Sequence, residues 1–168
     1  MMKEKMSSYG VKKKTVKVLT RKATLYDVKA IHSLVNRYAK RKLLLPRSLS
    51  YIYDNIRDFF VCENRRKQIV GCCSLHVVWE GLAEIKSLAV KRSYQGKHIG
   101  TILVEHCLNE ARQLKVDRVF ALAYEPGFFL KLKFSRISKA RLPAKVWREC
   151  TECHLFPDCE EIALIKYF

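Results

Sequence analysis

The chain has 168 residues, enough for one domain that buries about two-thirds of the surface its unfolded form exposes. Hydrophobic residues make up 49% of it and charged residues 29%, which excludes a disordered chain and predicts a packed core that needs no metal or disulfide. Lys and Arg number 33 against 16 Asp and Glu, and because this charge of +17 is scattered, we expect nucleic acid to bind only through nonspecific charge.

The first segment is rich in lysine and contains no apolar core of a signal peptide. We expect residues 1–14 to form a basic flexible arm and residues 15–168 to form a single domain. No apolar run reaches the ~20 residues that a membrane-spanning helix needs. The expected location is therefore the cytoplasm, with no membrane partner.

The first predicted elements are a strand, two helices and a second strand. Residues 16–22 alternate as a strand does, and Thr24 stands at the cap position of a helix with apolar residues at helical spacing. Ser48 caps a short helix through Ile56, and residues 59–62 form the next strand. A polar turn then leads to the centre of the sheet.

Two β-rich runs at the centre of the sequence, residues 68–79 and 82–90, are joined by a Glu-Gly pair typical of a hairpin. From Ile99 the apolar residues follow a helical period to Leu114, which predicts a long amphipathic helix. We therefore expect an antiparallel pair of strands followed by this helix.

The last part of the chain supplies a buried strand and a short helix, at residues 118–123 and 126–132. Two further strands are predicted at residues 134–137 and 161–168. Together the elements predict an α+β fold, a three-layer α/β/α domain with a central mixed, mostly antiparallel sheet.

A glycine-containing loop joins the strand at 82–90 to the long helix. The amides at the start of that helix face outward at its positive end, and this geometry suits a pyrophosphate. Gly96 and Gly100 let the backbone approach a ligand closely, and Arg92 and Lys97 add positive charge beside it. This junction is the predicted phosphate site.

The strand, the loop and the helix together resemble the GNAT superfamily of N-acetyltransferases, whose acetyl-CoA motif at this junction is Gln/Arg-x-x-Gly-x-Gly/Ala. Gln95 and Gly100 match the motif, whereas His98 occupies the place of its first glycine and there either weakens pyrophosphate binding or donates to phosphate. The resemblance extends over almost all of the chain after the arm and implies acetyl-CoA as cosubstrate. The cofactor-binding residues that it implies are Leu88, Ala89, Val90, Gln95, Gly96, Lys97, His98, Ile99, Gly100 and Thr101.

Three segments are similar to a narrower group, the short single-domain N-acetylglutamate synthases of bacterial arginine biosynthesis. They are residues 84–90, residues 45–48 and the pattern Val-Trp-x-x-Cys-x-x-Cys-x-x-Phe-Pro-x-Cys at residues 146–159. This resemblance implies transfer of an acetyl group from acetyl-CoA to the α-amino group of L-glutamate. The expected enzyme is an amino-acid N-acetyltransferase, which is an acyltransferase.

The GNAT resemblance also implies main-chain roles at the strand end and a base on the same strand. The amide of Leu88 is implied to bind the thioester carbonyl, where negative charge develops, and Val90 is implied to pair with the pantetheine. Glu84 is the expected general base, directly or through water, and we expect it on the same strand face as Leu88. The other interpretation of Glu84 is a structural ion pair with Lys86.

An acidic acceptor needs cations in the site. Arg47 and Lys86 are the expected substrate-binding residues, because Arg and Lys pair with carboxylates. The GNAT resemblance implies a tyrosine that protonates the leaving thiolate, at a position where this chain has Phe128 and Phe129. We therefore expect solvent or the amine's own proton to serve the thiolate.

The seven cysteines fall into two groups. Four stand in apolar runs, where a free thiol behaves as a small hydrophobe, and these are Cys62, Cys72, Cys73 and Cys107. The other three have enough soft ligands for zinc but lack the paired spacing of a zinc ribbon, and these are Cys150, Cys153 and Cys159. Free or redox-active thiols are the preferred interpretation, and no metal is predicted.

Two alternatives to glutamate acetylation stay open. One is a GNAT acetyltransferase that acts on another amine, such as a peptide, a polyamine or a protein lysine, because the fold does not fix the acceptor. The other is a basic nucleic-acid-binding module on a GNAT fold that has lost cofactor binding through His98. The oligomeric state is left open too, a homodimer included.

Overall fold

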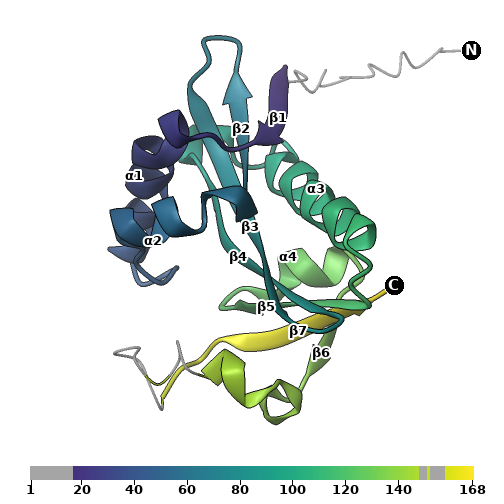
Figure 1. The fold of residues 1–168 in the computed structure, drawn as a ribbon. Helices are drawn as coiled ribbons and strands as arrows, with labels where there is room; N and C mark the ends of the chain where they lie inside the picture. The colour runs from purple at the N-terminus through teal and green to yellow at the C-terminus, as the bar shows by residue number, and fades with distance from the viewer. Residues whose placement is uncertain (1–16, 148–150, 152–157) are drawn as a thin grey trace, which may run out of the picture.

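The computed structural model describes residues 17–147, 151 and 158–168, which form a mixed seven-stranded sheet with helices on both faces (Figure 1). The predicted arm, residues 1–14, lies outside this part of the chain. The strands are β1 (Val18–Lys22), β2 (Phe59–Asn64), β3 (Ile69–Trp79), β4 (Leu82–Val90), β5 (Arg118–Ala123), β6 (Ser135–Ile137) and β7 (Ile162–Tyr167). The α-helices of the described residues are α1 (Val28–Ala39), α2 (Leu49–Asp54), α3 (Ile99–Gln113) and α4 (Pro126–Lys131).

The strand order in the sheet is β1-β2-β3-β4-β5-β7-β6. β4 and β5 run parallel, and the other neighbouring strands in the described residues run antiparallel. In Figure 1, α1 and α2 lie against one face of the sheet and α3 lies against the other. The predicted α+β fold with a mixed, mostly antiparallel sheet is confirmed.

Each face of the sheet has its own apolar core. On the face covered by α1, the side chain of Ile31 packs in one cluster with Phe59 of β2. On the face covered by α3, Leu103 packs in another cluster with Ile85 of β4. Full burial of one such side chain stabilises the fold by ~1.5–3 kcal/mol relative to its exposed state. These two cores hold β4 from both sides and so fix the strand that carries the site.

The four cysteines expected in the core are buried free thiols, as predicted, and they are Cys62, Cys72, Cys73 and Cys107. Burial raises the pKa of the Cys72 thiol to about 12, so this group is not a nucleophile at neutral pH. The sulfurs of Cys73 and Cys107 lie 3.6 Å apart between β3 and α3. These cysteines contribute to packing.

The helix α2 begins as predicted and ends earlier than predicted. The Ser48 hydroxyl accepts a hydrogen bond from the Tyr51 amide at 3.0 Å, which confirms the predicted cap. Asn55 then leaves the helical conformation, and its side chain donates to the Tyr51 carbonyl oxygen at 2.8 Å. Ile56 therefore falls in a separate 3-10 turn, Ile56–Asp58, instead of the same helix.

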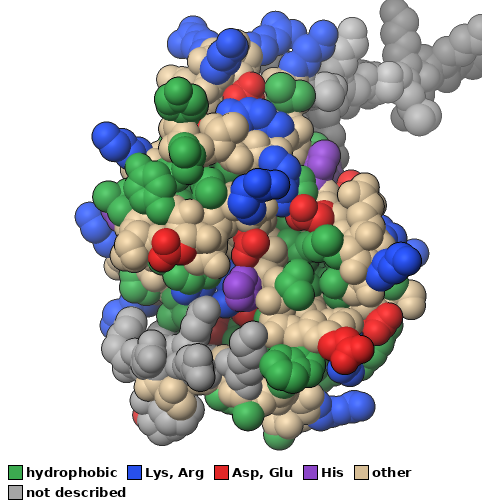
Figure 2. Space-filling view, viewed as in Figure 1, with side chains coloured by type: hydrophobic (Ala, Val, Ile, Leu, Met, Phe, Trp, Pro, Cys, Tyr) green, Lys and Arg blue, Asp and Glu red, His purple; other side chains and the backbone are tan. Residues whose placement is uncertain are grey.

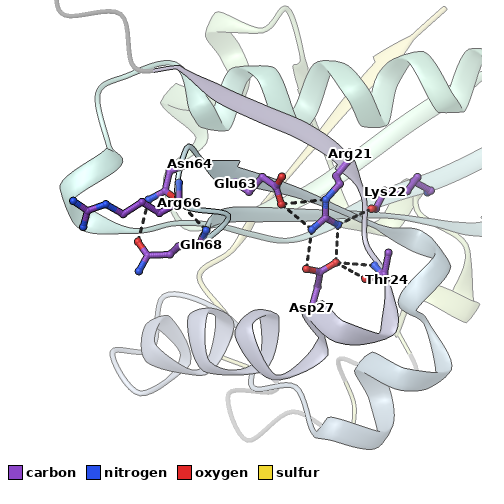
Figure 3. A network of polar contacts seen from close by, with 8 residues as sticks. All are labelled: Arg21, Lys22, Thr24, Asp27, Glu63, Asn64, Arg66 and Gln68. Atoms are coloured by element: carbon purple, nitrogen blue, oxygen red, sulfur yellow. Dashed lines mark hydrogen bonds and ion pairs between the residues drawn. The ribbon is translucent and has the colours of Figure 1, made fainter.

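An ion-pair network ties β1 to β2 and to the entrance of α1 (Figure 3). The Arg21 guanidinium donates to both carboxylate oxygens of Asp27, at 2.7 and 3.0 Å, and to Glu63 at 2.9 Å. The amide of Thr24 also donates to Asp27, in the 3-10 turn that precedes α1. Burial of Asp27 disfavours its ionised form, but the hydrogen bonds from Arg21 and Thr24 outweigh this effect and lower the pKa of the carboxyl.

The basic residues are distributed over the surface. Figure 2 shows Lys and Arg side chains at separate places around one face of the molecule, as the scattered sequence positions suggested. Arg65, Arg66 and Lys67, next to the end of β2, form an exposed basic group. Among the helices of the described residues, none has both the length and the apolar character to cross a membrane.

Candidate active site

The sheet opens between β4 and β5. Their parallel pairing runs from Leu82 with Arg118 to Ile85 with Ala121, and the described residues show no pairing beyond it. β4 nevertheless continues to Val90, so the last part of this strand has β3 on one side and no partner strand on the other. Main-chain groups along that edge can pair with a ligand instead of a strand.

A bulge in β4 reverses the alternation of side chains just before the strand end. The register between β3 and β4 shifts by one residue beside Ser87, which takes a left-handed φ of 52°. As a result, Ile85 and Leu88 both pack into the core on the α3 face. Glu84 alternates with Ile85 and faces the other way, so the expectation that Glu84 and Leu88 share a strand face is wrong.

A first cavity, of about 450 Å³, lies at the junction of β4, the following loop, α3 and α4, and we call it the loop cavity. All of the predicted cofactor-binding residues except Lys97 line it. The Lys97 ammonium instead donates to the Ser93 carbonyl oxygen at 2.7 Å. The first turn of α3 belongs to the lining, and the amides of a first helical turn have no partner within the helix. The loop cavity therefore offers donors for phosphate oxygens.

The backbone of the loop has the conformations that a glycine motif provides. His98, at the position of the motif's first glycine, has a left-handed φ of 61°, and Gly96 has a φ of 71°. An added Cβ at Gly96 would have no atom within 4 Å, whereas one at Gly100 would lie 3.3 Å from the Phe128 ring. Gly96 therefore leaves the loop open, and Gly100 brings α3 close to α4. His98 lines the cavity and is exposed.

Tyr38, at the end of α1, is a site residue that the sequence did not reveal. Its hydroxyl donates to the Val90 carbonyl oxygen and accepts from the Gln95 side-chain amide at 2.9 Å. Gln95 also approaches the Val90 carbonyl oxygen at 3.3 Å. These partners lie 52 and 57 residues away in the chain, so no local pattern marks Tyr38. The three residues fix the end of β4 against α1.

A second cavity, also of about 450 Å³, lies on the other side of the strand end, and we call it the acceptor cavity. Glu84, Lys86 and Arg47, the predicted base and the predicted substrate-binding residues, all line it. The Lys86 ammonium lies 3.3 Å from a Glu84 carboxylate oxygen, and both side chains are at most one-tenth exposed. The ion pair that the sequence offered as an alternative is therefore present, inside the cavity where a base would act.

Arg47 is held by its backbone and by a ring. Its amide donates to the Asn36 side-chain oxygen at 3.1 Å, and its carbonyl oxygen accepts from the Asn36 amide nitrogen at 2.7 Å. The guanidinium carbon lies 4.3 Å from the centre of the Tyr51 ring. These contacts between α1, α2 and the loop before α2 orient a cation at the cavity wall.

Glu161, just before β7, is a second carboxylate of the acceptor cavity that sequence reasoning missed. Burial raises the pKa of its carboxyl, while the Cys159 thiol, 3.6 Å away, and the charges of Lys139 and Arg47 act in the opposite direction. No motif contains Glu161, and it enters the cavity because β7 pairs with β5 from a distant part of the chain.

The two cavities meet at the strand end, because Tyr38, Leu88, Gln95 and Phe128 line both. A ligand with its phosphates in the loop cavity can therefore present its other end to a group bound in the acceptor cavity. At the predicted tyrosine position the rings of Phe128 and Phe129 pack edge to face, 5.1 Å apart, and they carry no proton donor. Tyr124 lines the acceptor cavity nearby.

The terminal cysteine group is only partly described. Cys150 and Cys153 lie outside the described residues, and Cys159 is a half-buried free thiol. Within the described part of the chain, no three His, Cys, Asp or Glu residues are arranged to hold a metal ion.

Comparison with known proteins gives three findings on this architecture. Residues 26–132 match the family model described as "Acetyltransferase (GNAT) family". An uncharacterized N-acetyltransferase of Chlorobaculum tepidum is 39% identical over 87% of this chain and 94% of its own. An amino-acid acetyltransferase of Mycobacterium tuberculosis is 38% identical over 78% of this chain and 76% of its own.

A solved structure extends the comparison to the fold. The N-acetylglutamate synthase of Neisseria gonorrhoeae, complexed with coenzyme A and N-acetyl-glutamate, superposes with a TM-score of 0.80 and 26% identity. The match covers 92% of this chain and 36% of that protein, so the chain corresponds to about a third of it.

Proposed function

The chain belongs to the acetyltransferase (GNAT) family and is an acetyl-CoA-dependent N-acetyltransferase, and we propose that its acceptor is the α-amino group of L-glutamate. The observation that carries the proposal is the acceptor cavity, which is lined by Arg47 and by the ion pair of Lys86 with Glu84. The similarity to an amino-acid acetyltransferase and to an N-acetylglutamate synthase supports the same acceptor.

The proposed reaction is direct attack of the amine on the thioester. The neutral amine forms a bond to the acetyl carbon, the carbon–sulfur bond breaks, and the amine proton passes to Glu84, directly or through water. The Leu88 amide, on the open edge of β4, donates to the carbonyl oxygen as it gains negative charge. The thiolate leaves with its electron pair and is protonated by solvent, or by the amine's own proton passed on from Glu84.

In the proposed reaction, Lys86 interacts both with the base, Glu84, and with the bound acceptor, so acceptor binding and proton transfer are linked. The Lys86 ammonium, 3.3 Å from Glu84, stabilises negative charge on that carboxylate. In the proposal, a carboxylate of glutamate takes over part of the interaction with Lys86, and Arg47 binds the other carboxylate. Binding of an acidic acceptor then leaves Glu84 better able to accept a proton, so acceptor binding prepares the base.

A second candidate acceptor is favoured by one observation. Glu161 and Glu125 also line the acceptor cavity, and carboxylates there favour an acceptor with a neutral or cationic end. Acetylation of another amine, such as a peptide, a polyamine or a protein lysine, is the alternative that these residues support.

A substrate panel tests the proposal. The purified chain is incubated with acetyl-CoA and with glutamate, glutamine, a polyamine or a lysine peptide, and the released thiol is measured. Release with glutamate above the other amines supports the proposed acceptor, and release with another amine alone overturns it. Absence of acetyl-CoA binding together with salt-dependent binding of DNA or RNA would favour a nucleic-acid-binding module instead.

The remaining parts of the proposal concern the cell and the assembly. We propose that the enzyme works in the cytoplasm, in arginine biosynthesis. Light scattering of the purified chain tests whether it forms a homodimer. Addition of arginine, the pathway product, to the thiol-release assay tests whether that product regulates the enzyme.

A further inference from the structure

The wall of the loop cavity contains a cation that comes from outside the loop. Among the described residues that line this cavity, Lys131 of α4 is the only Lys or Arg. The cations expected from the sequence are placed differently, since Lys97 donates to Ser93 and the lining does not contain Arg92. Among the described side chains that line the loop cavity, the permanent positive charge is therefore on α4 and not on the loop.

Lys131 lies one helical turn beyond the contact between α4 and the phosphate loop. Phe128 packs against Gly100, where an added Cβ would be 3.3 Å from the ring. Residues three apart lie on the same side of a helix and are separated by about 4.5 Å along its axis. The ammonium of Lys131 is thus on the Phe128 side of α4, displaced from the first turn of α3 by about one turn.

The same lysine borders a further cavity, of about 430 Å³, between the second half of α3 and the end of α4. Its lining also includes Arg112, Lys133 and Lys166, against Glu105 as the carboxylate. Burial lowers the pKa of Lys166, and the charges of Lys133 and Arg112 lower it further. These closely spaced cations attract an anion to the end of this cavity where Lys131 lies.

We propose that Lys131 forms a subsite for the phosphate monoester at the nucleotide end of acetyl-CoA, so that the enzyme binds CoA more tightly than dephospho-CoA. The pyrophosphate occupies the amides at the start of α3, and the monoester, separated from it by one ribose, is the more highly charged phosphate at neutral pH. Lys131 has no hydrogen bond or ion pair within the described residues and is exposed, so its ammonium is available to this phosphate. The inference rests on the loop cavity being the acetyl-CoA site.

Calorimetry without an acceptor tests this subsite independently of the acetyl acceptor. CoA and dephospho-CoA are titrated into the wild-type chain, the Lys131→Gln variant and the Lys133→Gln variant, which changes a neighbouring lysine that lines the further cavity and not the loop cavity. We expect the wild-type chain to bind CoA about 3- to 10-fold more tightly than dephospho-CoA. Lys131→Gln should reduce this ratio to about one, and Lys133→Gln should retain it.

The affinity for dephospho-CoA serves as the folding control, because Lys131→Gln should leave it unchanged. The proposal is overturned if the wild-type chain binds both ligands equally, or if Lys131→Gln weakens both by the same factor, which would place the ammonium on the pyrophosphate. It is also overturned if inorganic phosphate raises the melting temperature of the wild-type chain but not of Lys131→Gln, while the ratio of the CoA and dephospho-CoA affinities stays near one. Lys131 would then bind a free anion instead of the monoester of CoA. Failure of CoA to bind at all would instead refute the assignment of the loop cavity.

Discussion

Replacement of Glu84 by Gln separates the catalytic role proposed for this residue from its structural role. At 3.3 Å from Lys86, the Coulomb attraction is about 5 kcal/mol at an effective dielectric constant of about 20. Breaking a buried pair by removing one partner costs about 3–5 kcal/mol, because the other charge remains buried. The Glu84→Gln variant should therefore unfold about 6–20 °C below the wild type, if each kcal/mol shifts the melting temperature by about 2–4 °C.

The activity of the same variant is predicted to fall much further than its stability alone explains. At a temperature where it is fully folded, kcat should drop about 10²–10⁴-fold with little change in acetyl-CoA affinity, the usual effect of losing a general base. Lys86→Met should instead raise KM for the acceptor, and the double variant Glu84→Gln/Lys86→Met should recover stability but not kcat.

Thermal unfolding gives the melting temperature of each of the three variants, and thiol release gives kcat and KM. Both are measured over a range of pH. A wild-type kcat in Glu84→Gln would remove the base assignment. Recovery of kcat in the double variant would do the same, because it would show that only the loss of Glu84 as the ion-pair partner of Lys86 had been harmful.

Three further predictions follow from the site and the fold. Gly100→Asp should weaken acetyl-CoA binding about 10-fold or more, measured by calorimetry, because it adds a negative charge and bulk 3.3 Å from the Phe128 ring; equal affinity in the folded variant would exclude this loop. Arg47→Ala should reduce the preference for glutamate over glutamine, which we expect to be about 10- to 150-fold in kcat/KM, and equal kcat/KM for both amino acids in the wild type would end the glutamate assignment. The pKa of Asp27 lies below its ordinary value of 3.8 in the folded protein, so its stabilising effect is complete well above that value and disappears as the pH falls through the folded pKa. Acid unfolding of Asp27→Asn should show lower stability at neutral pH and a weaker dependence on pH below about 4; an unchanged acid transition would contradict the role of the Arg21 network.

The elements of the sheet's centre are well predicted by local sequence. The Glu-Gly pair between two β-rich runs specifies the hairpin of β3 and β4, and the helical period after Ile99 specifies α3. The loop proposed as the phosphate site is recognisable as a candidate for the same reason, since strand, glycines and helix follow one another directly. Local patterns report local structure, and this part of the site is local.

The parts of the site that the sequence does not predict depend on an unusual backbone conformation or on contacts between residues that are far apart in the chain. Ser87 carries no mark of a bulge, yet its left-handed conformation decides which way Leu88 points. Tyr38 and Glu161 enter the site because α1 and β7 pack next to β4 and β5, and no spacing in the chain encodes those contacts. The charges that surround the site residues and the burial of these residues can therefore be determined only from the folded structure.

The short pairing between β4 and β5 affects how readily the sheet opens at this place and how fast its amide hydrogens exchange with solvent. Within the described residues, four residue pairs, Leu82–Arg118 to Ile85–Ala121, join the β1–β4 part of the sheet to the β5–β7–β6 part. A ligand that pairs with the free edge of β4 supplies hydrogen bonds that a longer β5 would otherwise provide. Cosubstrate binding should therefore slow amide hydrogen exchange at Leu88 to Val90 and couple the two parts of the sheet into one cooperative unit.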